Sequence, residues 1–175
     1  MKTQYFLFIV ILLSVVSCNN TPQTDKQSDK QIKEKIIEGK ITTFIDSYLN
    51  KKDETVLNDI LTENYVRRIN GITVASNLEE LKAAMNIFYR GFPDLQITNE
   101  KSYIVNGEVF IHFTFMGTNT GLFAEETATS KKVKISGLSH LYFNDEGKMY
   151  QEDMYYNELD FLQQLGHSLI PPVTE

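Results

Sequence analysis

The sequence is poor in the residues that make cross-links and metal sites. It has one cysteine among 175 residues, which excludes an intramolecular disulfide and a zinc site built from several cysteines. Its three histidines, His112, His140 and His167, show none of the spacings that place two metal ligands on one helix face. We therefore expect no metal centre.

Positive charge is outweighed by negative charge, with 17 Lys and Arg against 23 Asp and Glu. The formal net charge is −6, and no long stripe of Lys and Arg is present to neutralise a phosphate backbone. The short basic run at residues 131–134 is typical of an exposed strand edge, where lysines block unwanted pairing. Glycine-rich phosphate loops and nucleophile-elbow motifs are missing too. We therefore expect no nucleic-acid partner.

Long apolar runs are missing except at the N-terminus. Lys2 precedes an apolar run over residues 5–13, and small residues follow before Cys18. This order is typical of a secretion signal, and the run is shorter than the ~20 residues that a membrane-spanning helix needs. Residues 15–18, Val-Val-Ser-Cys, resemble the lipobox of bacterial lipoproteins. That resemblance implies cleavage after residue 17 and diacylglycerol on Cys18, so that lipid anchors the protein to a membrane of the bacterial cell envelope.

The chain is predicted to have four parts. Residues 1–17 are the signal peptide, and residues 18–31 are the lipidated cysteine with a flexible tether. The tether consists of Asn, Thr, Gln, Ser, Asp and Lys with one Pro, a composition that cannot bury enough apolar surface to order itself. Residues 32–170 form a single domain, and residues 171–175 a C-terminal tail.

Apolar spacing predicts helices in the first half of the domain. Apolar residues recur at helical intervals from Ile32 to Leu49, and a second short helix is expected after Asp53. Asn77 is a suitable N-cap for a third helix, which Pro93 ends.

Strand signals dominate the second half. Asn106-Gly107 is the strongest hairpin signal, and we predict strands over residues 95–105, 109–116, 133–143 and 148–156, followed by a last helix. Strands joined by tight hairpins run antiparallel, and helices on one side of such a sheet make an α+β domain.

Several short segments in this half resemble one family. They are Phe92-Pro93-Asp94-Leu95, the loop Gly117-Thr118-Asn119-Thr120-Gly121, and Val133-Lys134-Ile135-Ser136-Gly137. In this order and spacing they resemble the SnoaL-like polyketide (ester) cyclases of the NTF2-like superfamily. The resemblance implies an NTF2-like cone, in which a curved antiparallel sheet packs against N-terminal helices and encloses a pocket. It also implies cofactor-free acid-base chemistry on a small apolar carbonyl compound, with a pocket carboxylate assisting an intramolecular aldol closure.

Two positions depart from the family pattern. Asn119 stands where the family loop usually has His, and Asn157 stands where the last strand often ends in Asp. An amide donates and accepts hydrogen bonds but cannot act as a general base. We therefore expect Asn119 and Asn157 to bind the substrate by hydrogen bonds and not to carry protons.

The last strand offers two candidate carboxylates. Its residues alternate between faces, so Asp153 shares a face with Asn157, and Glu152 lies on the other face. We prefer Asp153 as the catalytic group because its face includes the family's Asp position; Glu152 replaces it if the opposite face lines the pocket. His112, where relatives often carry a basic residue, is the expected catalytic partner because imidazole titrates near neutrality.

Four aromatic residues, Phe88, Phe92, Tyr142 and Tyr155, are expected to line the pocket and bind an apolar substrate. Three functions stay open: the enzyme just described, a catalytically silent module that binds a small ligand at the envelope, and a scaffold that forms a homodimer. A buried carboxylate facing His112 favours the enzyme. A pocket lined by apolar groups and amides favours binding, and a filled cone favours the scaffold.

Overall fold

The computed structural model of the protein describes residues 23–105 and 107–171. The predicted signal peptide, Cys18 and residues 172–175 lie outside the described residues. None of the helices within these ranges is long and apolar enough to cross a membrane.

Helix α1 (Gln23–Thr43) starts earlier than the apolar spacing predicts. Residues 23–31, assigned to the tether from composition, are helical. They contain neither Gly nor Pro, and Lys30 pairs with Glu34 one turn later at 3.7 Å. Residues 27–33 are exposed. An exposed helix needs no apolar face, so the spacing of apolar residues does not mark where this helix begins.

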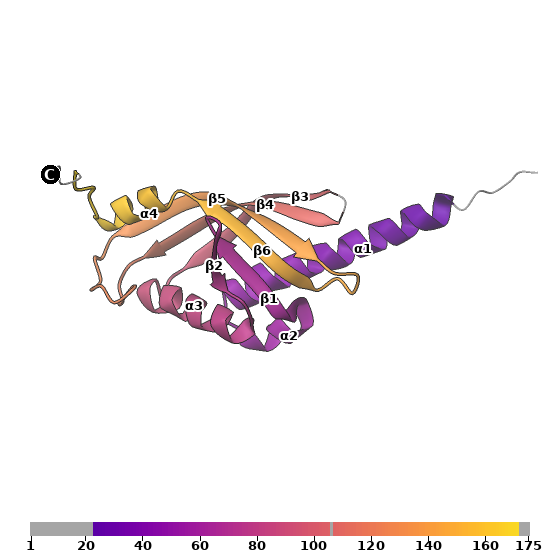
Figure 1. Ribbon diagram of the computed structural model, residues 1–175, viewed down its shortest axis with the longest axis horizontal. Helices are drawn as coiled ribbons and strands as arrows, with labels where there is room; N and C mark the ends of the chain where they lie inside the picture. The colour runs from indigo at the N-terminus through magenta and orange to yellow at the C-terminus, as the bar shows by residue number, and fades with distance from the viewer. Residues whose placement is uncertain (1–22, 106, 172–175) are drawn as a thin grey trace, which may run out of the picture.

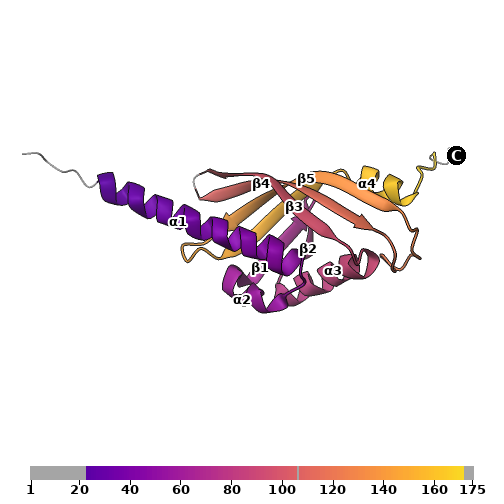
Figure 2. The same cartoon turned by 180° about the vertical axis from the view of Figure 1, so that it is seen from behind.

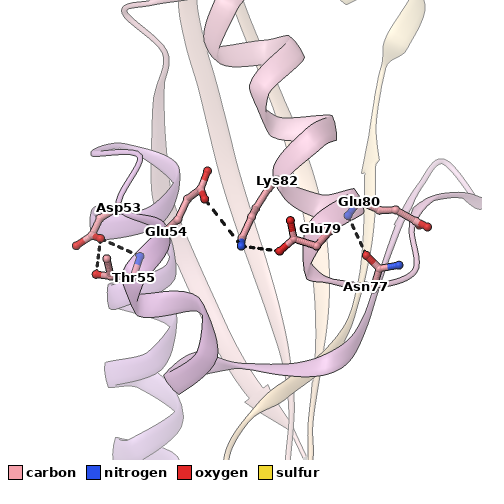
Figure 3. A network of polar contacts seen from close by, with 7 residues as sticks. All are labelled: Asp53, Glu54, Thr55, Asn77, Glu79, Glu80 and Lys82. Atoms are coloured by element: carbon pink, nitrogen blue, oxygen red, sulfur yellow. Dashed lines mark hydrogen bonds and ion pairs between the residues drawn. The ribbon is translucent and has the colours of Figure 1, made fainter.

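The second half of α1 carries the apolar face expected for this segment. It continues into a π-helix, η1 (Phe44–Leu49), and the side chains buried along this stretch are Ile37, Ile41, Phe44, Ile45, Tyr48 and Leu49. A 3-10 turn, η2 (Glu54–Val56), and α2 (Leu57–Ile60) follow. The Asp53 carboxylate caps this turn by accepting a hydrogen bond from the Thr55 amide at 3.0 Å (Figure 3).

Six strands form one curved sheet in the order β2-β1-β6-β5-β4-β3. Four of the five strand pairings are antiparallel, and β1 runs parallel to β6. The strands are β1 (Leu61–Ile69), β2 (Ile72–Ala75), β3 (Gln96–Val105), β4 (Glu108–Thr118), β5 (Lys132–Phe143) and β6 (Met149–Tyr156). The α+β class, with N-terminal helices and a curved sheet, is confirmed, although β1 and β2 come before α3.

Three helical segments cover one face of this sheet. Figures 1 and 2 show α1, α2 and α3 (Leu78–Gly91) on the concave side, with the N-terminal part of α1 projecting past the sheet. Helix α4 (Glu158–Leu165) packs against β5 at the other end. The hydrophobic core therefore lies inside the cone, between the concave face and these helices.

A side chain caps the N-terminus of α3, and an ion pair links the first turns of this helix to η2 (Figure 3). The Asn77 side chain accepts a hydrogen bond from the Glu80 amide at 2.9 Å, which confirms its predicted role as N-cap. Lys82 lies 2.8 Å from Glu79 and 3.9 Å from Glu54 of η2. Such surface pairs contribute little energy individually, and only the pair with Glu54 joins α3 to the helical segment before β1, since Glu79 lies in α3 itself.

Gly137 of β5 permits a close approach inside the cone. A Cβ atom there would lie 2.4 Å from Cζ of Phe113 and 2.5 Å from the backbone oxygen of Tyr155. We expect Gly137→Ala to lower the free energy of unfolding by about 1–3 kcal/mol through overpacking. Gly39 of α1 has open space where an alanine methyl group would lie, with no described atom outside its own stretch of helix within 4 Å, so Gly39→Ala should instead stabilise by about 0.4–1 kcal/mol. Urea denaturation measures both, and unchanged stability of Gly137→Ala would contradict the packing described.

Candidate functional site

A cavity of about 370 Å³ lies inside the cone, between α3 and the concave face of the sheet. Two of its lining residues, Val74 and Ile87, are 37% and 47% exposed, so it opens between β2 and α3. Its size falls within the ~300–1,000 Å³ typical of small-molecule pockets. The lining residues are Leu49, Arg67, Ile69, Val74, Ala84, Met85, Ile87, Phe88, Leu95, Ile97, Phe113, Phe115, Ile135, Met154, Tyr156 and Phe161.

Among these lining residues, Arg67 alone carries a charge. It lies on β1, on the strand face that it shares with Tyr65 and Ile69, and it is only 6% exposed. Its Nη1 donates to the Met85 sulfur at 3.0 Å, and its Nη2 lies 3.9 Å from the Met154 sulfur. A thioether is a weak acceptor, so the terminal nitrogens of this guanidinium are poorly satisfied.

A buried carboxylate lies on the other side of Arg67. Oε2 of Glu152 is 3.2 Å from Nε of Arg67 and accepts a hydrogen bond from the Tyr65 hydroxyl at 2.8 Å. Oε1 accepts one from the Ser139 hydroxyl, also at 2.8 Å. Glu152 lines a second cavity, of about 40 Å³, and is not part of the larger one. Arg67 lines both, so it is the charged group that a molecule in the larger cavity would meet.

Burial and neighbouring charge set the protonation states of this cluster. Burial acts to lower the pKa of Arg67, but the Glu152 carboxylate and the Tyr65 hydroxyl act the other way, and the net pKa lies above its ordinary value. Burial also raises the pKa of Tyr65 well above its ordinary value, with a further contribution from Glu152. Arg67 is therefore a cation, and Tyr65 is a neutral hydrogen-bond donor.

Two buried tyrosines provide a matched test of the cluster. Tyr65 donates to Glu152, whereas the Tyr48 hydroxyl has no hydrogen-bond partner among the described residues. We expect Tyr65→Phe to lower the free energy of unfolding by about 1.5–3 kcal/mol, because a bond to a charged group is lost. Tyr48→Phe should be neutral or stabilising, because it removes an unsatisfied polar group. Chemical denaturation compares the two, and a greater loss in Tyr48→Phe would contradict this view.

Asp153, the preferred catalytic carboxylate, does not line either cavity. On β6 the inward-facing set includes Glu152 and Met154, so strand alternation turns Asp153 to the outer face. There it accepts a hydrogen bond from the Tyr142 hydroxyl at 3.2 Å and pairs with Arg68 at 3.5 Å. Asp153 is therefore not a cavity residue, and Glu152, the alternative that strand alternation left open, is the carboxylate on the inner face.

His112 is exposed on the outer face of β4, and β5 lies between β4 and β6. Its neighbours across the sheet are Lys101 on β3 and Leu138 on β5. The structure therefore does not bring His112 together with Asp153 or with the buried Glu152. The predicted His–carboxylate pair is absent from the described residues.

The four aromatic residues predicted to line the pocket lie on opposite sides of the sheet. Phe88 lines the larger cavity. Phe92 is fully buried and packs edge-on against Phe115, with ring centroids 5.5 Å apart, but it does not line the cavity. Tyr142 and Tyr155 lie on the outer face, and Tyr155 is 48% exposed. The last two predictions are corrected for the same reason as Asp153, because both strands turn these positions outward.

Asn119 and Asn157 bind the backbone and line neither cavity. The buried Asn119 donates to the Gly121 carbonyl at 3.0 Å and accepts from the Thr129 amide at 2.7 Å, which holds the loop after β4. Asn157 is the N-cap of α4 and accepts from the Asp160 amide at 3.0 Å. Their side chains thus shape the cone, and neither is placed to touch a molecule in the cavity.

Arg67 is the residue of this site that the sequence analysis missed. It lies opposite Glu152 in the parallel pairing of β1 with β6, and no hairpin signal marks such a pairing. The available signal was weak. One arginine stands between Tyr65 and Ile69 at the alternate positions of a short strand, which is a charge on an otherwise apolar face.

Comparison with known families agrees with this fold. Residues 39–165 match the SnoaL-like polyketide cyclase family. The chain belongs to this family. The match runs from the end of α1 to the end of α4, so the SnoaL-like region includes the whole sheet and both cavities.

Solved structures of low sequence identity share the SnoaL-like fold. A SnoaL-like protein from Jannaschia sp. CCS1 has a TM-score of 0.68 and 15% identity, over 79% of this chain and 94% of that chain. TsrD from Streptomyces laurentii has a TM-score of 0.65 and 20% identity, over 75% and 95%. A SnoaL-like polyketide cyclase from Agrobacterium tumefaciens has a TM-score of 0.60 and 16% identity, over 74% and 98%. The predicted NTF2-like cone is thus confirmed. No curated protein matches the chain.

Proposed function

We propose that this SnoaL-like protein binds a small apolar molecule inside its cone. The observation that carries the proposal is the cavity of about 370 Å³, whose lining is apolar apart from Arg67 and the hydroxyl-bearing Tyr156. Removing apolar surface from water favours binding by about 25 cal/mol per Å² before the entropy cost of association. The opening between β2 and α3 gives such a molecule a route into the cone.

Equilibrium dialysis with 2-acetylnaphthalene, an apolar aromatic ketone, tests this proposal. We expect saturable binding of one molecule per chain. Absence of binding, or uptake that rises without saturation, would contradict it.

Cyclase-type acid-base catalysis is the second candidate, and family membership favours it. It would be cofactor-free chemistry on a small apolar carbonyl compound, with Glu152 as the base. A base must reach its proton at about 2.6–3.2 Å. Donors already engage both oxygens of Glu152, and Arg67 stands between it and the larger cavity, so the geometry supports binding better. Turnover that stops in Glu152→Gln while binding persists would establish the catalytic candidate.

We also propose a lipid anchor on Cys18 that holds the domain at the bacterial cell envelope. The lipobox-like segment ending at Cys18 supports it, and the N-terminal part of α1 projects past the sheet (Figure 1). Mass spectrometry should find a mature chain that begins at acylated Cys18, and Cys18→Ser should lose membrane association. A mature chain that retains residues 1–17 would contradict the anchor.

A homodimer would use the outer face of the sheet. This face presents Tyr103 and Tyr155, which are 44% and 48% exposed, and the stacked rings of Phe110 and His140. Sedimentation equilibrium should show a dimer for the wild-type chain. The Tyr155→Arg variant should dissociate more readily. A wild-type chain that stays monomeric at high concentration would argue against this use of the face.

A further inference from the structure

We infer that Arg67 determines ligand specificity, by selecting molecules that present an uncharged hydrogen-bond-accepting oxygen to the inner end of the cavity. The inference rests on the proposed function, since it needs a ligand in the larger cavity. It names the polar group that such a ligand carries and the residue that binds it.

The guanidinium of Arg67 has donors without a strong acceptor. Its Nε lies 3.2 Å from the Glu152 carboxylate as an ion pair but makes no well-directed hydrogen bond among the described residues, and the hydrogen-bond partners of Nη1 and Nη2 there are only thioether sulfurs. Buried N–H groups normally find a good acceptor, and sulfur is a weak one. The Met85 and Met154 side chains that touch the guanidinium also line the cavity, so an oxygen there could replace a sulfur as the acceptor.

The charges of Arg67 and Glu152 balance each other. Arg67 and Glu152 form an ion pair at 3.2 Å in which both side chains are almost wholly buried, so the pair is neutral as a whole. An uncharged oxygen, as in a ketone, ester or amide, accepts from Arg67 without disturbing that balance. A carboxylate ligand would leave a net negative charge in an apolar cavity, which is strongly unfavourable. The site should therefore favour neutral acceptors over acids.

The side chains around the guanidinium can yield to such a ligand. Methionine is unbranched and has three rotatable side-chain bonds, so it adapts to groups of different shape. Met85 comes from α3 and Met154 from β6, so the ligand oxygen would be received between the helix and the sheet. Specificity would thus come from Arg67, and tolerance of shape from the methionines.

Three naphthalene derivatives of similar size test the inference by equilibrium dialysis. They are 2-acetylnaphthalene, which has a neutral oxygen, 2-ethylnaphthalene, which has none, and 2-naphthoate, which is an anion. A hydrogen bond from a charged donor corresponds to roughly tenfold to hundredfold in affinity. We expect the wild-type protein to prefer the ketone to the hydrocarbon by that factor, and to bind the anion most weakly.

Two variants test whether Arg67, and its charge balance with Glu152, cause this order of affinities. Arg67→Met should bind the ketone and the hydrocarbon with similar affinity. Glu152→Gln leaves Arg67 without its counter-charge, so 2-naphthoate should become the tightest of the three. If Glu152→Gln does not fold, the wild-type order and Arg67→Met still decide the question.

The outcomes separate this inference from the proposed function. Saturable binding of all three compounds with equal affinity would overturn the role of Arg67 and leave the cavity as a binding site. A preference for the ketone that persists in Arg67→Met would also overturn it. Failure of all three to bind would overturn both the inference and the proposed function.

Discussion

Replacing Glu152 by alanine should lower the free energy of unfolding by about 3–5 kcal/mol, the cost of removing one partner of a buried ion pair. The change would leave the Arg67 cation without a counter-charge, since Glu152 is 3% exposed and Arg67 is 6% exposed. It would also take away the acceptor of the Tyr65 and Ser139 hydroxyls. Guanidinium denaturation would measure the loss, with the same m-value expected for the variant and the wild type.

A double variant provides the control for this effect. Arg67→Met combined with Glu152→Leu removes both charges and keeps side chains of similar volume. Buried ion pairs replaced in this way are often neutral or stabilising. We expect the double variant to be far more stable than Glu152→Ala. If Glu152→Ala instead lost less than about 1 kcal/mol, Arg67 would have to reach solvent, against its burial in the cone.

Filling the cavity should reduce ligand affinity sharply. Ala84 lines the cavity from α3, so Ala84→Phe would place a ring in the space that the ligand needs. Overpacking of about 1–3 kcal/mol corresponds to roughly tenfold to hundredfold weaker binding. Equilibrium dialysis with 2-acetylnaphthalene measures the change.

The neighbouring alanine gives a matched control. Ala83 lies on the same helix but is exposed and does not line the cavity. Ala83→Phe should therefore bind the ketone as the wild type does. Unchanged affinity in Ala84→Phe would mean that the ketone binds elsewhere on the protein.

Much of the fold follows from local sequence signals. Helical apolar spacing, the N-cap Asn77 and the Asn106-Gly107 turn place most elements close to where the structure has them. Strand β2 was not predicted, because it has four residues and three of them are exposed. The Asn-Gly pair that joins it to β1 does carry a local signal, and in the structure Asn70 and Gly71 both have the positive φ that such a pair favours.

The site was harder to predict because it depends on which strand face curves inward. Alternation defines two sets of residues on β6 but does not say which set faces the cone. Asp153 was preferred because its face includes the family's Asp position at Asn157, yet Asn157 lies at the end of the strand and caps α4. Arg67 meets Glu152 only through a parallel pairing of strands about eighty residues apart in the chain, which local signals cannot indicate.

The buried cluster and the cavity form one arrangement. Tyr65 and Ser139 hold Glu152, Glu152 balances Arg67, and Arg67 faces the apolar cavity. The polar residues thus place one guanidinium at a defined point among apolar walls. This arrangement suits recognition of a single oxygen on an otherwise apolar molecule.

The most direct test of the binding site is methionine methyl NMR during titration with 2-acetylnaphthalene. Met85 and Met154 line the cavity, whereas Met116 is 38% exposed outside it and Met149 is buried elsewhere in the core. The account predicts saturable shifts of the Met85 and Met154 methyl signals, with those of Met116 and Met149 nearly unchanged. Shifts confined to Met116, or no shifts at saturating ketone, would contradict it.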